Sequence, residues 1–283
     1  MNYRHAFHAG NFADVVKHAV LTRILIHLAA KPTAYRVIDT HAGAGLYDLT
    51  GPQANRTGEW REGIARLAAA QLTPPAEALL SLYLDTVASF NRGGSLTTYP
   101  GSPALTRALL RPRDRLLVCE IEPETALALA ENLRGDARVK IVAIDGWTAL
   151  KAYVPPKERR GLVLVDPAFE QPDEFARLAD GLAAAHRKWP TGIYLLWYPI
   201  KERKQPYLLA RRLAGTGIPN ILRAEFEVAA PDADRLNACG LAVVNPPWLL
   251  ERELAVLLPA LASCLARDPG SGAARLDWLA REK

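Results

Sequence analysis

Short apolar segments alternate with longer amphipathic segments along most of the chain. Residues 11–30 predict a helix, because Asn11 can cap its N-terminus and apolar residues recur on one face from Val15 onward. Residues 124–134 and 175–188 predict further helices between apolar runs. The apolar, β-branched runs predict seven strands, at residues 35–39, 116–120, 139–145, 162–166, 193–198, 222–228 and 241–245. Strands that alternate with helices predict an α/β fold with a mainly parallel seven-stranded sheet.

One long interval interrupts this alternation. About 75 residues separate the first two predicted strands, where a single crossover helix would suffice. Residues 58–70 and 75–91 within the interval both predict helices. We therefore expect a small helical insertion subdomain at residues 51–100 that shapes a substrate pocket, although such an insertion can also be without function. The main domain would comprise residues 1–50 and 101–283, with an N-terminal helical motif at 1–31.

Composition describes an ordinary globular protein. The 283 residues are 49% hydrophobic and 23% charged, which excludes wholesale disorder. The longest apolar run, at residues 254–266, is too short to cross a membrane. Asp14 and Lys17 lie where a signal peptide would need an apolar stretch. The three cysteines are far apart and form no CxxC pair, so neither a disulfide framework nor a zinc ribbon is expected. We expect a cytoplasmic protein.

The charge balance is mildly positive. Lys and Arg number 35 against 30 Asp and Glu, which gives a net charge of +5. That charge tolerates a polyanionic partner without requiring one. Arginine predominates and suits phosphate recognition, although a GC-rich genome would produce the same bias. Basic clusters at residues 107–115, 157–160 and 201–204 leave room for a basic stripe.

Acidic residues follow the first four predicted strands. They are Asp39, Glu120, Asp145 and Asp166. Ligands of open α/β sheets bind beyond the carboxyl ends of the strands, so these acids are expected at one crevice. Glu120 can accept hydrogen bonds from the two ribose hydroxyls of a nucleoside cofactor, and Asp145 from an adenine amine. Gly43, in the turn after the first strand, lets the backbone approach such a ligand closely.

The glycine turn does not by itself identify the ligand. It lacks the third glycine and the acid about 20 residues further on that a nicotinamide-dinucleotide fingerprint requires. The chain contains no GxxxxGK[ST] loop, which excludes a P-loop nucleotidase. It contains no Gly-x-Ser-x-Gly elbow and no Cys–His signature, so acyl transfer has no support.

The most informative motif is Asp166-Pro167-Ala168-Phe169, here named the Asp166 motif. It is close to the Asp/Asn-Pro-Pro-aromatic motif with which amino-methyltransferases hold an exocyclic amine. The Asp166 carboxylate and the Pro167 carbonyl would accept the amine protons and orient the nitrogen toward the methyl group of S-adenosylmethionine. Phe169 would stack on the base, which must be flipped out if it is paired. The alternative is a plain Asp-Pro turn.

A second copy, Asn245-Pro246-Pro247-Trp248, matches the motif more closely by letter and is here named the Asn245 motif. Its position argues against a functional role. It follows the seventh strand, far from the glycine turn, whereas Asp166 follows the fourth strand, which is expected beside the first. We interpret the Asn245 motif as a structural turn with Trp248 buried.

Histidines are concentrated near the N-terminus, at His5, His8, His18 and His27. No cysteine joins them and their spacing matches no HExxH pattern, so we expect no metal site. Core or surface positions are the default for such residues. A further possibility is that His18 and His41 face the cofactor crevice as hydrogen-bond donors.

Several longer stretches are distinctive in combination. They are YRHAFHAGNFADVVKH at residues 3–18 and the segments 39–45, 99–103, 166–170, 197–199 and 245–248. Together they closely resemble the RlmJ family of 23S ribosomal RNA adenine-N6 methyltransferases, nearly end to end, and the N-terminal stretch is the most specific. The resemblance implies a Rossmann-like S-adenosylmethionine-dependent methyltransferase fold with a small helical subdomain. The family has also carried an older label that links it to the use of external DNA.

The resemblance also implies the site. The cofactor residues would be His18, His41, Ser102, Glu120, Asp145, Gly146 and Asp166. Asp166 would be the catalytic acceptor, and Tyr3 would lie near the target base. Ser102 before Pro103 also fits a helix N-cap, and Tyr3 also fits a disordered terminus. The family motif reads Asp-Pro-Pro-Tyr, so Ala168 and Phe169 are departures that leave amine binding intact and bear on rate and base preference.

The sequence therefore predicts methyl transfer from S-adenosylmethionine to the exocyclic amine of one adenine in 23S ribosomal RNA. We expect a monomer that needs no metal and no membrane. Three alternatives stay open. The chain is a DNA adenine methyltransferase, a nucleic-acid-binding protein without catalysis that is linked to external DNA, or a metal hydrolase built on the early histidines. The absence of a sizeable target-recognition domain argues against the DNA enzyme.

Overall fold

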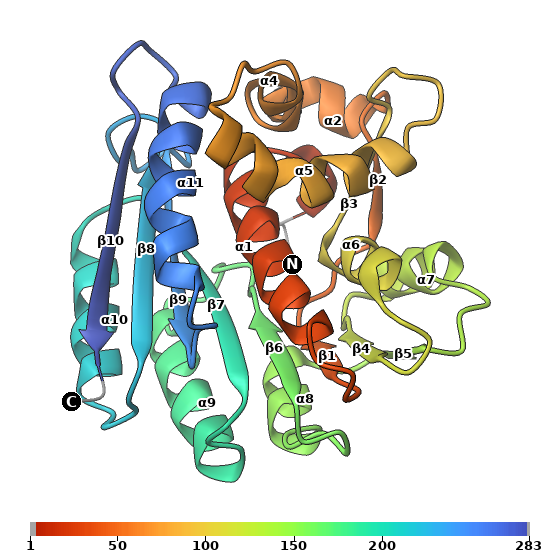
Figure 1. The fold of residues 1–283 in the computed structure, drawn as a ribbon, viewed down its shortest axis with the longest axis vertical. Helices are drawn as coiled ribbons and strands as arrows, with labels where there is room; N and C mark the ends of the chain where they lie inside the picture. Colours follow the sequence, from red (N-terminus) through yellow and green to blue (C-terminus); the bar gives the residue numbers. More distant parts are fainter. Residues whose placement is uncertain (1–3, 282–283) are drawn as a thin grey trace.

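The computed structural model describes residues 4–281, and this part of the chain forms one eight-stranded sheet with helices on both faces (Figure 1). The strand order is β10-β8-β9-β7-β6-β1-β4-β5. The strands are β1 (Arg36–Asp39), β4 (Arg115–Cys119), β5 (Val139–Val142), β6 (Gly161–Val165), β7 (Ile193–Pro199), β8 (Ile221–Glu227), β9 (Ala238–Val244) and β10 (Ala273–Ala280). The run from β7 to β5 is parallel, and β9, β8 and β10 add antiparallel neighbours. The predicted α/β fold and mainly parallel sheet are confirmed.

The predicted strand count of seven is wrong by one, because β10 forms an eighth strand at the edge of the sheet. It pairs antiparallel with β8. Its residues are more exposed than those of the inner strands, and polar Arg275 and Asp277 alternate with Leu276 and Trp278. An edge strand carries charges and no continuous apolar run, so a search for such runs passes over it. The alternation itself is the signal that identifies it.

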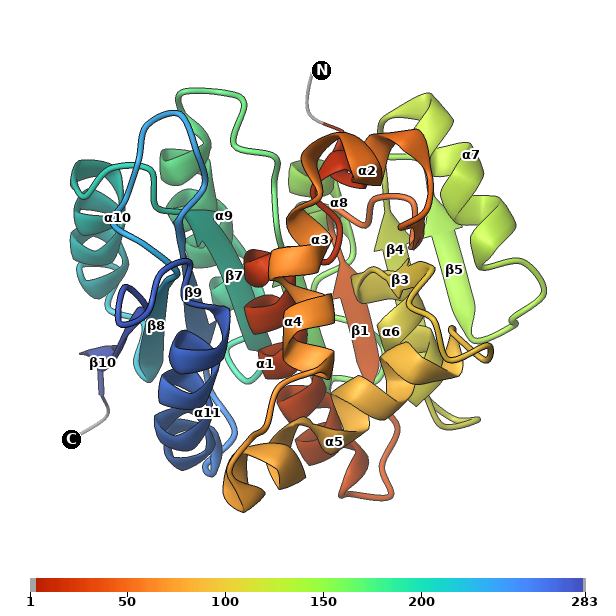
Figure 2. The ribbon, with the colours of Figure 1, turned by 90° about the horizontal axis from the view of Figure 1, so that it is seen from above.

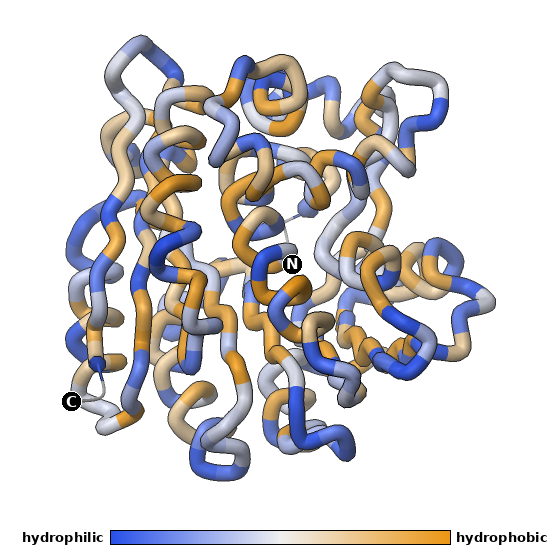
Figure 3. The backbone as a smooth tube through the Cα atoms, viewed as in Figure 1, coloured by the Kyte–Doolittle hydropathy of each residue, from blue (hydrophilic) through white to orange (hydrophobic). Residues whose placement is uncertain are grey.

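Helices cover the two faces of the sheet in two groups. One face carries α1 (Phe12–Ala29), α5 (Pro74–Ser89), α6 (Ser102–Leu109), α7 (Pro123–Asn132) and α11 (Leu250–Leu265). The other face carries α8 (Gly146–Ala152), α9 (Glu174–Lys188) and α10 (Lys204–Ala214). Figure 2 shows α9 and α10 across the sheet from α5 and α11. Each group of helices buries its own hydrophobic core against the sheet. The loops at the lower edge of the sheet in Figure 3, including the one after α1, are largely hydrophilic.

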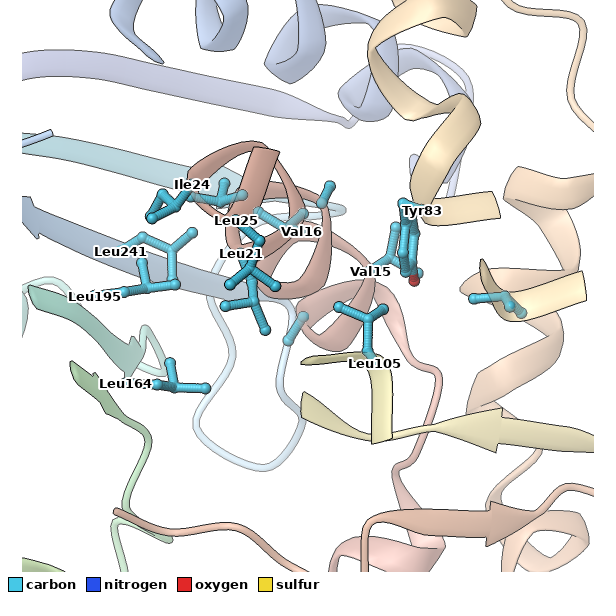
Figure 4. Close-up of a cluster of buried hydrophobic side chains, with 14 of the residues drawn as sticks. Val15, Val16, Leu21, Ile24, Leu25, Tyr83, Leu105, Leu164, Leu195 and Leu241 are labelled. Carbon is cyan, nitrogen blue, oxygen red and sulfur yellow. The ribbon is translucent and has the colours of Figure 1, made fainter. Parts of the chain in front are cut away.

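Helix α1 is central to the first core. The Asn11 side chain caps it by accepting hydrogen bonds from the amides of Ala13 and Asp14, which confirms the predicted start. Most of its residues are buried, because it lies between the sheet and the helices α5, α6 and α11. Figure 4 shows Val15, Val16, Leu21, Ile24 and Leu25 of α1 among side chains from the sheet, α5 and α6. A helix enclosed in this way also carries its few polar residues into the interior.

The interval between β1 and β4 holds several short elements besides α5 and α6. They are β2 (Leu46–Asp48), β3 (Thr98–Pro100), α2 (Pro52–Thr57), α3 (Glu59–Glu62) and α4 (Ile64–Ala68). The single helix predicted at 58–70 is wrong, because Gly63 interrupts it. A Cβ on Gly63 would lie 2.1 Å from the carbonyl oxygen of Gly10, which also accepts a hydrogen bond from the Ile64 amide. The helix predicted at 75–91 is confirmed as α5, and the division into subdomains stays a prediction.

Within residues 4–281, every helix falls short of the length and apolarity that a membrane crossing requires.

The positions at which the parallel strands end determine where ligand-binding residues come together. Strand β6 pairs with β1 on one side and with β7 on the other, and β1 also pairs with β4. The ends of the strands that carry Asp39, Glu120 and Asp166 thus lie at one edge of the sheet.

Candidate active site

A cavity of about 850 Å³ opens at the carboxyl ends of the parallel strands. Its volume lies within the range of pockets that hold cofactors and substrates. Residues 40–43 after β1, 119–122 after β4, 145–147 after β5 and 166–171 after β6 line it, together with part of α1. It brings together the sequence-predicted residues His18, His41, Gly43, Ser102, Glu120, Asp145, Gly146, Asp166, Pro167 and Phe169. Tyr3 lies outside the described residues.

The glycine turn after β1 is held against the end of β4. The Gly43 amide donates a hydrogen bond of 2.9 Å to Glu120 Oε2, and the Ala42 amide donates to the Cys119 carbonyl. Gly43 has a φ of 63°, and a Cβ there would lie 2.2 Å from the Tyr47 hydroxyl oxygen. Both the backbone conformation and the close approach therefore require glycine at this position.

The two acids at one end of the cavity are oriented by backbone amides. Glu120 Oε1 accepts from the Glu122 amide at 2.9 Å, so both of its carboxylate oxygens have fixed directions. Asp145 caps α8 by accepting from the amide of Thr148 at 2.8 Å. Gly146 packs so closely beside His41 that a Cβ at this position would lie 2.5 Å from His41 Nε2. These contacts give that end of the cavity a fixed acceptor geometry.

His41 and Ser102 also line this cavity. Burial lowers the pKa of His41 to about 4, and its ring makes an edge contact with Trp147 at 5.3 Å. The Ser102 hydroxyl donates a hydrogen bond of 2.6 Å to Asp39 Oδ2. Burial raises the pKa of Asp39 to about 6, although the hydrogen bond from Ser102 acts in the opposite direction. The alternative prediction that Ser102 is a helix N-cap is wrong, because Gly101 occupies the N-cap position of α6.

Asp166 belongs to a buried charge network that sequence reasoning missed. Lys17 Nζ forms an ion pair with Asp166 Oδ2 and lies 2.9 Å from Asp14 Oδ1. His5 Nε2 is 2.9 Å from the second Asp14 oxygen. Burial alone would lower the pKa of Lys17, but the carboxylates of Asp14 and Asp166 hold that pKa well above its usual range. Lys17 therefore stays charged while only 5% exposed.

Asp14 is the second carboxylate of this network. Burial alone would raise its pKa, but His5 and Lys17 hold the pKa of Asp14 well below its usual range. The signal that could have revealed the network is an Asp and a Lys three residues apart in a helix whose other positions are mostly apolar. Charged residues on such a helix are buried only when they are paired.

Phe169 forms an aromatic wall with two residues from other elements. Its ring centroid lies 4.8 Å from that of Phe175 in α9 and 5.8 Å from that of Trp197 in β7. Phe169 has a φ of 53°, a conformation that non-glycine residues rarely adopt. All three residues line the cavity next to Asp166. Phe175 was not singled out from the sequence, since its approach depends on how α9 packs.

The Asn245 motif lies at the opposite edge of the sheet. Strand β9 runs antiparallel to β7, so its end meets the beginning of β7. Asn245 Nδ2 donates hydrogen bonds to the carbonyls of Pro190 and Gly192 at 2.7 and 2.8 Å. The predicted burial of Trp248 is wrong, because its side chain precedes α11 at this edge and is 73% exposed. The motif thus acts as a turn, as expected, but not around a buried tryptophan.

Two of the early histidines, His5 and His8, have carboxylate partners. His5 contacts Asp14, and His8 Nδ1 lies 3.0 Å from Glu59 Oε1. Among residues 4–281, no group of three His, Cys, Asp or Glu side chains has the arrangement of a metal site. The metal-hydrolase alternative has no support from this geometry.

Comparisons with known proteins point in one direction. A family model described as ribosomal RNA large subunit methyltransferase D, RlmJ, matches residues 32–280. Ribosomal RNA large subunit methyltransferase J of Escherichia coli is 43% identical, and that of Haemophilus influenzae is 38% identical, each over the full length of both chains. The crystal structure of protein LPL1258 from Legionella pneumophila is 31% identical, with a TM-score of 0.87 over 95% of this chain and 98% of that one.

Proposed function

The chain belongs to the RlmJ family of ribosomal RNA large subunit methyltransferases, and from this premise we propose that it transfers a methyl group from S-adenosylmethionine to the N6 amine of one adenine in 23S ribosomal RNA. The observation that carries the proposal is the Asp166 motif, which lines the cavity at the carboxyl end of the sheet. Its aspartate is ion-paired with Lys17 and its phenylalanine belongs to an aromatic wall. This arrangement suits a planar base that presents an amine.

The residues at the other end of the cavity fit S-adenosylmethionine. Glu120, held by the Gly43 and Glu122 amides, lines the cavity and would accept hydrogen bonds from ribose hydroxyls. The buried Nε2 of His18 lacks a hydrogen-bond partner among residues 4–281, which leaves it available to a ligand. When bound, the cofactor would supply an electrophilic methyl group on a sulfonium sulfur. The proposed binding residues are His18, His41, Gly43, Ser102, Glu120, Asp145, Gly146 and Asp166.

Asp166 and Pro167 would act on the target amine. Lys17 occupies Oδ2 of Asp166, which leaves Oδ1 to accept one amine proton while the Pro167 carbonyl accepts the other. The amine of neutral adenine is a weak nucleophile because its lone pair is delocalised into the ring. Two acceptors fixed in place direct that lone pair at the methyl group and stabilise the positive charge that develops on nitrogen. Phe169, Phe175 and Trp197 would hold the flipped base by stacking.

The proton leaves N6 after the methyl group has been transferred. Asp166, which pairs with Lys17, need not take this proton, because water can accept it afterwards. We also propose that the protein acts as a monomer.

Transfer of a labelled methyl group from S-adenosylmethionine tests this proposal. The substrates are ribosomal RNA from cells that lack the gene and unmethylated DNA, and Asp166→Ala is the control variant. We expect label in one adenine of 23S ribosomal RNA, none in DNA and none with the variant. Label in DNA alone would establish the DNA methyltransferase instead. Nucleic-acid binding without label and without affinity for S-adenosylmethionine would establish a binding protein.

A further inference from the structure

A buried chain of hydroxyl groups connects helix α5 to the cofactor end of the cavity. The Tyr83 hydroxyl oxygen lies 2.9 Å from that of Tyr99, which lies 2.7 Å from His18 Nδ1. The Tyr99 and His18 rings stack with centroids 5.6 Å apart. All three side chains are fully buried. Tyr83 comes from α5, Tyr99 from β3 and His18 from α1, so three elements meet at this chain.

His18 is neutral in this environment. Burial lowers the pKa of His18 to about 3, and the nearby Asp14 carboxylate does not offset that effect. A neutral imidazole carries one proton, on either Nδ1 or Nε2, and the partner of one nitrogen decides the state of the other. Nε2 has no hydrogen-bond partner among residues 4–281, and the residue lines the cavity. The state of Nδ1 therefore determines what His18 offers to a ligand.

The tyrosine pair fixes the order of the protons. Burial raises the pKa of both Tyr83 and Tyr99, so both hydroxyls keep their protons. Tyr99 is the only hydrogen-bond partner of the Tyr83 hydroxyl within residues 4–281. Tyr83 must then donate to Tyr99, and Tyr99 must donate to His18 Nδ1. The reverse order would leave the Tyr83 proton buried without an acceptor, which is unfavourable.

The proton of His18 therefore lies on Nε2. The Asp14 carboxylate supports this tautomer, because its Oδ1 lies 3.9 Å from Nε2 and attracts the positive end of that N–H group. The distance is too long for a hydrogen bond, so the N–H group stays available. Lys17, the other donor in this part of α1, is occupied by Asp14 and Asp166.

We propose that Tyr99, held by Tyr83, is a positioning residue that keeps His18 in the Nε2–H tautomer, so that the imidazole donates to the carboxylate of the methionine part of S-adenosylmethionine. This inference rests on the proposed function. With Glu120 and Asp145 assigned to the adenosine and Asp166 to the methyl group, His18 of the same cavity would serve the amino-acid end of the ligand. The carboxylate at that end of the ligand accepts hydrogen bonds and needs a donor. The buried carboxylates of Asp39 and Asp14 are acceptors and cannot supply one, whereas the Nε2–H group of His18 can.

Two ligands separate this role from a packing role. S-adenosylhomocysteine has the amino-acid carboxylate, and 5′-methylthioadenosine lacks it. Calorimetry on the unliganded protein should show that Tyr99→Phe weakens the first ligand about threefold, because only the Nε2–H fraction of the mixed population donates to the carboxylate, and leaves the affinity for the second unchanged. Tyr83→Phe should show the same selectivity with a smaller loss. Tyr194→Phe is the matched control, because its buried hydroxyl donates to the Trp189 carbonyl in the other core.

The tautomer itself can be observed without any ligand. Nitrogen-15 chemical shifts of the His18 ring should identify the Nε2–H form in the wild-type protein and a mixture of both forms in Tyr99→Phe. An Nδ1–H form in the wild type, or equal weakening of the two ligands by Tyr99→Phe, would overturn the inference and leave the proposed function intact. A wild-type protein that binds neither ligand would overturn both.

Discussion

Two similar motifs occupy opposite edges of the same sheet, and the difference between them shows what makes a site. The Asp166 and Asn245 motifs each follow a buried strand, and each contains one residue in the left-handed region, Phe169 with a φ of 53° and Asn245 with a φ of 51°. Strand β6 runs parallel to β1, whereas β9 runs antiparallel to β7. The direction of the strand therefore places one motif at the cavity and the other away from it.

The neighbours of the two motifs differ accordingly. The side-chain amide of Asn245 donates hydrogen bonds to two backbone carbonyls. One carboxylate oxygen of Asp166 is paired with Lys17, and the other has no hydrogen-bond partner among residues 4–281. Phe169 lies in an aromatic wall, whereas Trp248 is exposed. The Asp166 motif, which matches the Asp/Asn-Pro-Pro-aromatic pattern less closely, is thus the one that has a charged partner, stacking neighbours and a cavity.

The largest difference between the motifs is expected in turnover. Asp166→Ala should lower the rate of methyl transfer by about a thousandfold, because it removes an acceptor that acts on charge developing in the transition state. Single-turnover kinetics with excess enzyme measure this rate.

Asn245→Ala is the matched control for Asp166→Ala. It should leave the rate within about twofold while it lowers the free energy of unfolding by about 1–2 kcal/mol, since two backbone carbonyls lose a partner. A rate lost with Asn245→Ala and retained with Asp166→Ala would reverse the assignment of the two motifs.

The second prediction concerns the charge partner that only the Asp166 motif has. Lys17→Met should lower the free energy of unfolding by about 3 kcal/mol, because Asp14 and Asp166 would lose a buried cation. Urea unfolding at neutral pH measures this loss.

Arg212→Met provides the control for the lysine, because the ion pair of Arg212 with Asp180 is largely exposed. It should cost less than about 0.5 kcal/mol. Equal losses in the two variants would show that the Lys17 network does not stabilise the fold beyond an ordinary surface pair.

The third prediction concerns the aromatic wall. Phe169→Ala should raise the KM for ribosomal RNA about tenfold or more, because base stacking on an aromatic side chain contributes about 1–3 kcal/mol. The affinity for S-adenosylhomocysteine should stay unchanged. Steady-state kinetics at saturating cofactor give the KM. A loss confined to cofactor affinity would instead assign Phe169 to cofactor binding.

The smallest effect is expected at the tryptophan of the Asn245 motif. Trp248→Ala should change both the rate and the KM by less than about twofold and the free energy of unfolding by less than about 0.5 kcal/mol, because the side chain is 73% exposed. The same kinetic and unfolding measurements apply. A large increase in the KM for ribosomal RNA would instead make this edge part of the RNA-binding surface.

Much of the fold follows from the sequence, because buried strands read as apolar runs and strand ends determine where ligands bind. The runs that end in Asp39, Glu120 and Asp166 were recognisable for this reason, and the cavity lies where they end. Edge strand β10 was missed because its charged, exposed residues break the apolar pattern. The helix expected at 58–70 breaks at Gly63 because of a contact with Gly10, which is distant in sequence.

The parts of the site that escaped prediction depend on tertiary contacts. Lys17 and Asp166 are 149 residues apart, and their ion pair forms only because the fold brings the start of α1 to the end of β6. The burial predicted for Trp248 failed because the local sequence does not show whether another element packs over the turn before α11. The hydroxyl chain from Tyr83 to His18 likewise needs α5, β3 and α1 to meet. Local patterns therefore located the strand ends, and packing supplied the partners of the residues placed there.

Hydrogen–deuterium exchange tests most directly whether the Asp166 motif is the one that holds the target base. The protein with saturating S-adenosylhomocysteine is compared with and without adenosine 5′-monophosphate as a probe of the base site. The nucleotide should slow exchange in peptides that cover residues 166–171 and leave peptides that cover 245–249 unchanged. Slower exchange at 245–249 with no change at 166–171 would contradict the account.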